Sequence, residues 1–263
     1  MQSSKNIYYK NIKNNDPHVP HIIWGHGWAQ THSALLPTAI SLKNIAHHWL
    51  IDLPGFGHSS QPNSVYGSLE YAAIIADWIK QNIPSKAKKI WVGHSFGGKL
   101  GITLAAKYPT LIDGLFLIAA SGIPRKRTII QEVIVKIKIK IFKFLKYLNK
   151  TINNDRYSEW LKTKFGSQDY KNASNPHMRA ILVKIVNENL SNIASQISCP
   201  TELIYGELDT ETPVIIGNIF NKLINNSKIH IIPKEDHYSI LSKTQHQIAY
   251  LLKQFTKKII QGN

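Results

Sequence analysis

Residues 93–97 read Gly-His-Ser-Phe-Gly, and this short stretch constrains the fold more than any other part of the chain. A Gly-x-Ser-x-Gly run fits a sharp turn from a strand into a helix, which lifts the serine hydroxyl out of the backbone. Residues 89–92 are rich in β-branched and aromatic side chains, and residues 99–108 have a helical pattern. The strained turn needs small neighbours on both sides of the serine, and Gly93 and Gly97 supply them. The sequence therefore predicts a strand–turn–helix unit with Ser95 at its tip.

Strands and helices alternate along most of the chain. We expect strands near residues 7–12, 21–24, 48–51, 89–92, 114–118, 200–206 and 228–232. Helical patterns separate them, which indicates an α/β fold with a mostly parallel sheet and helices on both faces. Only helical patterns and loops occur between residues 123 and 198. We therefore expect a core at residues 1–122 and 199–263, with an inserted helical cap, or lid, at residues 123–198.

Composition narrows the class of protein further. The 263 residues are 43% hydrophobic and 18% charged, which suits one globular α/β domain with an insertion. The single cysteine, Cys199, excludes an internal disulfide and a metal site built from several cysteines. The first residues lack the apolar core of a signal peptide, and no stretch approaches ~18 uninterrupted apolar residues. We expect a cytoplasmic protein without a membrane span.

A serine hydroxyl is a weak nucleophile unless a base takes its proton and a carboxylate orients that base. Asp209 follows the predicted strand at residues 200–206, where the carboxyl end of a parallel strand places functional groups. His237 follows the next strand, at residues 228–232. Ser95, Asp209 and His237 therefore form a candidate catalytic triad, with each member at the end of a strand.

Each of these assignments has a simpler alternative. Asp209 could cap the helix after Pro213, and Glu207 and Glu211 are neighbouring acids. His237 is one of twelve histidines in the chain. We expect the others that lie near motifs or in the last helix to be structural or on the surface; these are His26, His58, His94 and His246.

An acyl-transfer reaction also needs hydrogen-bond donors for the oxyanion that forms on the carbonyl oxygen. One candidate is the backbone N–H of Phe96, at the positive end of the helix that follows the serine. The loop after the strand at residues 21–24 reads Gly-His-Gly-Trp and offers the backbone N–H of Trp28 as the second donor.

With these residues in place, the chain resembles the α/β-hydrolase superfamily, and within it the bacterial cofactor-free serine esterases with a helical cap. The matching segments are residues 26–28, 52–59, 93–98 and 205–209, together with His237. The Gly-Trp pair at residues 27–28 makes the chain similar to carboxylesterases of the pimeloyl-carrier methyl ester esterase type. The resemblance implies a carboxylic ester hydrolase (EC 3.1.1.-) that uses neither a cofactor nor a metal. The chain departs from the family's usual histidine loop, because Asp236 precedes His237 and Ser242 stands where an acid is expected.

The charge distribution bears on the partner. The chain carries 32 basic and 16 acidic residues, a net charge of +16, and residues 125–164 hold twelve basic and three acidic residues, a local balance of +9. Apolar residues recur there at three- and four-residue steps, which favours a long amphipathic helix; they are Ile130, Ile134, Ile137, Ile141, Phe144, Leu145 and Leu148. This helix could simply cover the cleft with solvated lysines, touch an anionic lipid surface, or receive an acidic carrier protein. No nucleic-acid-binding module is recognisable.

Taken together, these patterns predict a serine hydrolase that cleaves a small-molecule carboxylic ester through an acyl-enzyme. A second hypothesis is an esterase or thioesterase whose acyl chain is presented by an acidic carrier protein, such as a pimeloyl-acyl-carrier-protein methyl ester. A third is a non-catalytic binding protein for an anionic surface.

Overall fold

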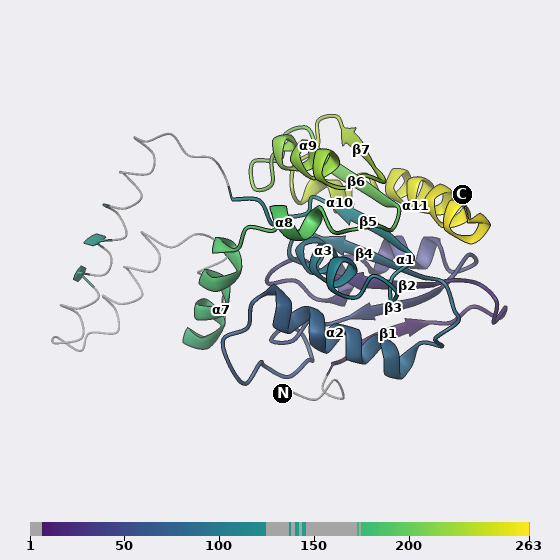
Figure 1. Ribbon diagram of the computed structural model, residues 1–263, viewed down its shortest axis with the longest axis horizontal. Coiled ribbons are helices and arrows are strands. Elements are labelled where there is room, and N and C mark those ends of the chain that lie inside the picture. The colour runs from purple at the N-terminus through teal and green to yellow at the C-terminus, as the bar shows by residue number, and fades with distance from the viewer. Residues whose placement is uncertain are drawn as a thin grey trace. The chain divides into compact units, whose positions relative to one another are not determined.

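The computed structural model describes residues 7–124 and 175–262, together with residues 137, 140, 141, 144, 145 and 173. Seven strands form one sheet in the order β1-β3-β2-β4-β5-β6-β7 (Figure 1). Their bounds are β1 (Tyr9–Ile12), β2 (His21–Gly25), β3 (His47–Ile51), β4 (Lys89–His94), β5 (Gly114–Ile118), β6 (Thr201–Gly206) and β7 (Ser227–Ile232). Only β1 is antiparallel to its neighbour, and the other pairings are parallel. The predicted α/β fold with a mostly parallel sheet is therefore confirmed.

The central strand β4 shows why both faces of the sheet are covered. Successive side chains of a strand point to opposite faces, and every residue of β4 is buried. Ile90 and Val92 belong to an apolar cluster that also contains Leu252 and Phe255 of α11 (Gln245–Gln261). Trp91 points the other way and packs against Gly101 of α3 (Phe96–Lys107), where an added Cβ would lie 2.4 Å from the indole. A parallel sheet buried on both faces explains the continuous apolar runs of the sequence.

The remaining helices complete the two layers. α1 (Leu36–Ser41) contacts α11, while α2 (Ser68–Asn82) and α3 contact each other (Figure 1). α9 (Val214–Leu223) packs on β6 and β7. The sequence patterns did not predict two four-residue helices, α8 (Ser191–Ala194) and α10 (Ser239–Ser242), nor the short 3₁₀ turn η2 (His32–Ala34) as separate from α1.

The chain divides into two compact units. The first comprises Met1–Ile123 and Glu188–Asn263 and holds the sheet, and the second is Pro124–Asn187. The sequence predicted an insertion over residues 123–198. The second unit is shorter, because residues 188–198 are grouped with the sheet. The second unit contains α7 (Pro176–Asn187), whose first turn is held by a hydrogen bond from the Met178 N–H to Asn175 Oδ1 (2.9 Å).

Most of the predicted basic amphipathic helix lies outside the described residues. Of its apolar stripe, only Ile137, Ile141, Phe144 and Leu145 are described, and all four are helical. In the described parts of the chain, no helix combines the length and the apolar character that crossing a membrane requires.

Candidate active site

Ser95 stands between β4 and α3 in a conformation that serine rarely adopts. Its φ is +49° and its ψ is −105°, which places it in a strained, left-handed part of conformational space. Backbone hydrogen bonds hold it there, because its N–H donates to the Ile118 carbonyl (2.9 Å) and its own carbonyl accepts from Lys99 (3.0 Å) and Ser121 (3.2 Å). Surrounding structure that fixes a strained residue is typical of functional sites.

The two glycines of the motif are required by close backbone approach. A Cβ on Gly93 would lie 2.4 Å from the carbonyl oxygen of Gly97, and a Cβ on Gly97 would lie 2.0 Å from the carbonyl oxygen of Gly25. The start of α3 therefore packs directly against the end of β2, the strand that leads into the predicted oxyanion loop. This arrangement gives a physical reason for the Gly-x-Ser-x-Gly spacing.

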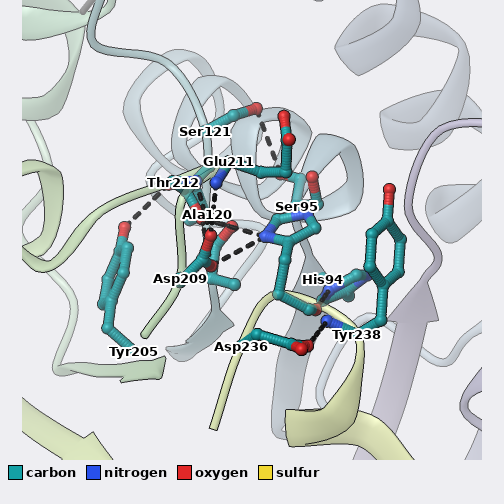
Figure 2. Close-up of polar contacts among 12 residues, drawn as sticks. His94, Ser95, Ala120, Ser121, Tyr205, Asp209, Glu211, Thr212, Asp236 and Tyr238 are labelled. Atoms are coloured by element: carbon teal, nitrogen blue, oxygen red, sulfur yellow. Dashed lines mark hydrogen bonds and ion pairs between the residues drawn. The ribbon is translucent and has the colours of Figure 1, made fainter. Parts of the chain in front are cut away.

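Asp209 and His237 meet in the structure, and Figure 2 labels Asp209 and draws its polar contacts as dashed lines. Nδ1 of His237 lies 2.8 Å from Oδ2 of Asp209, and both side chains are buried. An ionised carboxylate can only accept, so in the neutral form of the imidazole the proton lies on Nδ1 and Nε2 carries the lone pair. This is the tautomer that a general base needs.

The neighbouring acids have different partners in the structure. Oδ1 of Asp209 accepts the N–H groups of Glu211 and Thr212, each at 2.7 Å, while Oδ2 faces His237. Asp209 therefore caps the following turn and contacts the imidazole at once. Glu207 uses its carboxylate to accept the Lys234 N–H (3.0 Å), and the side chain of Glu211 is exposed.

The electrostatics of Asp209 favour its charged form. Burial alone would raise the pKa of this carboxyl, but hydrogen bonds and charge attraction from His237, with further hydrogen bonds from Thr212, lower the pKa below its usual value. Asp209 is thus a carboxylate at neutral pH and can stabilise an imidazolium.

Ser95 and His237 are not hydrogen-bonded to each other in the structure, although both are described. His94, the residue before the serine, lies against His237, with the two ring centroids 4.9 Å apart. Hydrogen bonds between nucleophile and base are often long before a substrate binds. The structure thus brings the candidate acid and the candidate base together and places the residue before Ser95 against His237.

The two predicted oxyanion donors are the backbone N–H groups of Phe96 and Trp28. Neither donates a hydrogen bond to a residue that the structure describes. The rings of these residues are in edge-to-face contact, with centroids 5.4 Å apart. The loop and the start of α3 are joined at the same point, because the Gly97 N–H donates to the His26 carbonyl (3.0 Å).

Three polar side chains near the site hold its loops in place. His26 accepts the Leu53 N–H at Nε2 (2.9 Å) and contacts the Gly27 carbonyl through Nδ1 (2.7 Å), which agrees with its expected structural role. His94 lies between two catalytic loops, with Nε2 3.1 Å from the His237 carbonyl and Nδ1 3.2 Å from Gln30 Oε1. Burial lowers the pKa of His94 to about 3, so this side chain is neutral at physiological pH.

Asp236, the residue that departs from the usual histidine loop, has a local role. Its Oδ1 accepts the N–H groups of Tyr238 (2.9 Å) and Ser239 (2.8 Å), and its own N–H donates to the Ser239 hydroxyl (2.8 Å). Asp236 therefore organises the turn into α10, directly after His237. Asp-x-x-Ser at residues 236–239 is the signal from which this turn could have been predicted.

Among the residues that the structure describes, no group of three or more His, Cys, Asp or Glu side chains could hold a metal ion. Thr212 and Gln30 are polar groups at the site that the sequence analysis missed. Thr212 lies three residues after Asp209, a spacing at which an aspartate often caps a turn.

Comparison with known proteins agrees with this geometry. Residues 20–138 match the α/β hydrolase fold family. The chain is 29% identical over 257 residues to a pimeloyl-[acyl-carrier protein] methyl ester esterase of Wigglesworthia glossinidia brevipalpis, covering 90% of this chain and 93% of the relative. An enzyme of the same name from Vibrio campbellii is 24% identical and covers 87% and 91%. A crystal structure described as a putative lipase from Acinetobacter baumannii superposes with a TM-score of 0.73 at 18% identity, covering 100% of this chain and 91% of that one.

The strand order, the serine turn and these comparisons show that the chain has the α/β-hydrolase fold. Within that fold it is a carboxylic ester hydrolase, similar to the bacterial pimeloyl-[acyl-carrier protein] methyl ester esterases.

Proposed function

We propose that Ser95, His237 and Asp209 are the catalytic triad of this esterase. The observation that carries the proposal is the 2.8 Å contact between His237 Nδ1 and Asp209 Oδ2, beside a serine held at φ +49°. The contact leaves His237 Nε2 free to act as the base, and the strained turn presents the Ser95 hydroxyl.

The reaction follows from these positions. The Ser95 oxygen attacks the ester carbonyl while His237 takes its proton, and the N–H groups of Trp28 and Phe96 stabilise the oxyanion. His237 then gives the proton to the departing alcohol, which leaves an acyl-serine ester. A water molecule attacks that ester with the same base, so one ester and one water yield one acid and one alcohol.

A fluorophosphonate probe combined with a p-nitrophenyl ester assay tests this assignment. We expect the probe to label Ser95, and Ser95→Ala to lose both the label and the turnover. Ser121→Ala provides a matched control, because the Ser121 hydroxyl contacts the Ser95 carbonyl (3.4 Å) and has no role in the proposed chemistry. Labelling of another serine, or turnover that survives in Ser95→Ala, would overturn the proposal.

The substrate proposed for this site is a methyl ester on an acyl chain that an acidic carrier protein presents. Two observations support it. The relatives from Wigglesworthia glossinidia brevipalpis and Vibrio campbellii, which cover about nine-tenths of the chain, are named as methyl ester esterases of an acyl-carrier protein, and residues 125–164 carry a local charge balance of +9. A basic surface attracts an acidic partner and raises the rate of encounter.

Charge reversal separates a carrier-linked substrate from a free ester. We expect a triple variant, Lys136→Glu, Lys140→Glu and Lys143→Glu, to lower kcat/KM for the carrier-linked ester about tenfold or more. The rate on a small p-nitrophenyl ester should stay within about twofold. Equal losses on both substrates would contradict carrier docking at these lysines without touching the triad assignment.

A further inference from the structure

The Thr212 hydroxyl lies at the site but has no role in the reaction proposed above (Figure 2). Its Oγ1 lies 2.8 Å from Asp209 Oδ2, 3.1 Å from His237 Nδ1 and 3.0 Å from the Ala119 carbonyl oxygen. Thr212 is only 4% exposed. One hydroxyl therefore contacts the acid, the base and the backbone at the end of β5.

Counting protons shows how the hydroxyl can serve all three contacts. It has one proton, which it can donate to the Asp209 carboxylate or to the Ala119 carbonyl, because neither of these oxygens can donate. Its lone pairs remain available to the Nδ1–H of His237. That N–H is directed mainly at Oδ2, at 2.8 Å, and secondarily at the hydroxyl, at 3.1 Å.

The backbone contact ties this hydroxyl to the serine turn. Ala119 follows β5 with φ +47°, and its N–H donates to the Ile204 carbonyl (2.7 Å). The residue before it, Ile118, accepts the N–H of Ser95 (2.9 Å). The end of β5 thus holds the nucleophile on one side and, through Thr212, the acid and the base on the other.

We infer that Thr212 is a positioning residue for catalysis. Its hydroxyl holds the Asp209 carboxylate and the Nδ1–H of His237 at a fixed position relative to the serine turn. This inference rests on the triad assignment proposed above. The backbone N–H of Thr212, which caps Asp209 Oδ1, is present whatever the side chain. Only the hydroxyl contacts depend on the residue type.

Two substitutions isolate the hydroxyl. Thr212→Val keeps the shape and removes the hydroxyl, while Thr212→Ser keeps the hydroxyl. We expect Thr212→Val to lower kcat about tenfold, because the hydroxyl bonds to a charged group that orients the base, with KM within about twofold. Thr212→Ser should recover most of the activity.

The pH profile provides a readout that packing alone would not move. Removing the hydroxyl takes a donor from the Asp209 carboxylate and an acceptor from the Nδ1–H of His237, which changes the balance between the neutral and the protonated imidazole. The acid limb of kcat/KM should therefore shift in Thr212→Val and return toward the wild-type position in Thr212→Ser. Thr256→Val, which removes another buried hydroxyl bonded to a carbonyl in α11 (2.7 Å), should leave both kcat and the acid limb unchanged.

The outcomes separate this inference from the triad assignment. If fluorophosphonate labels Ser95 in the wild type and Thr212→Val keeps the wild-type kcat and acid limb, the inference about Thr212 is wrong and the triad stands. The inference is also wrong if Thr212→Ser is as slow as Thr212→Val while both fold normally. If Ser95 is neither labelled nor required, the triad proposal fails first.

Discussion

In the part of the chain that the structure describes, two buried aspartates each contact a histidine with nearly the same geometry. Asp209 Oδ2 lies 2.8 Å from His237 Nδ1, and Asp52 Oδ1 lies 2.9 Å from His32 Nδ1. Both aspartates follow parallel strands, β6 and β3, and both have lowered pKa values, because hydrogen bonds from histidine and backbone N–H groups outweigh the effect of burial. A short aspartate–histidine contact is therefore not a catalytic signal on its own.

The difference lies in what surrounds each pair. Around Asp52, the donors are His32, through its ring and its backbone, and the His58 N–H (3.0 Å). Tyr8 packs on both histidine rings, with centroids 5.3 and 4.8 Å away. His237 instead has the ring of His94 beside it, and with it the strained turn that carries Ser95. The first pair satisfies a buried carboxylate inside a loop, and the second lies beside the turn that carries the proposed nucleophile.

Replacing each aspartate by asparagine should distinguish the two aspartate–histidine pairs most clearly. Asp209→Asn keeps the shape but removes the charge that stabilises an imidazolium and favours the wrong tautomer, so we expect kcat to fall about 10⁴-fold. Asp52→Asn should keep kcat within about twofold. Its amide group would face N–H donors, so its free energy of unfolding should fall by about 1–3 kcal/mol.

Ester turnover and urea unfolding, measured on both variants, check this pair of expectations. Comparable losses of turnover in folded Asp52→Asn and Asp209→Asn would show that the two pairs act together. Normal turnover in Asp209→Asn would remove Asp209 from the triad.

A glycine beside Asp52 sharpens the comparison through stability. Gly57 has φ +53°, and a Cβ there would lie 2.1 Å from Asp52 Oδ2. We expect Gly57→Ala to lower the free energy of unfolding by about 2 kcal/mol or more, because both the conformation and the clash are unfavourable. Turnover per folded molecule should persist. Gly262→Ala is a matched control, since Gly262 also has positive φ, at +75°, but nothing within 4 Å of the added Cβ.

The sequence was sufficient for the frame of the fold because its signals are local. β-branched runs marked the strands of the sheet, and the helical pattern predicted at residues 99–108 overlaps α3 (Phe96–Lys107). Glycines whose Cβ would collide with backbone, such as Gly93 and Gly97, marked the serine turn without any knowledge of tertiary structure. The end of each strand then indicated which acid and which histidine to consider.

The sequence could not reveal what depends on contacts between distant segments. Nothing in the sequence around Thr212 indicates that its hydroxyl reaches the Ala119 carbonyl, 93 residues away. Asp52 and Asp209 cannot be told apart by local pattern, since each follows a strand and each finds a histidine. Only the position of the serine turn relative to the two histidines separates them.

Some histidines are buried without a carboxylate partner, and these lower the stability of the fold at acidic pH. His48 accepts the indole N–H of Trp24 at Nδ1 (3.1 Å) and donates from Nε2 to the Leu42 carbonyl (3.0 Å), which requires the neutral ring. Burial lowers its pKa from 6.5 to about 4. The stability from the neutral ring is therefore fully present above pH 6.5 and is lost as the pH falls toward 4.

Urea unfolding followed by tryptophan fluorescence between pH 6.5 and 4.5 tests this effect. It is smaller than the effects expected for the aspartate variants and for Gly57→Ala. Each such histidine contributes up to about 1.4 kcal/mol per pH unit to the loss. His48→Gln should flatten the pH dependence of the free energy of unfolding by about that amount, whatever its effect at neutral pH. His246→Gln, at an exposed position of α11, should leave the slope unchanged. An unchanged slope in His48→Gln would mean that acid destabilises the protein elsewhere, with the carboxylates of the two aspartate–histidine pairs as the next groups to replace.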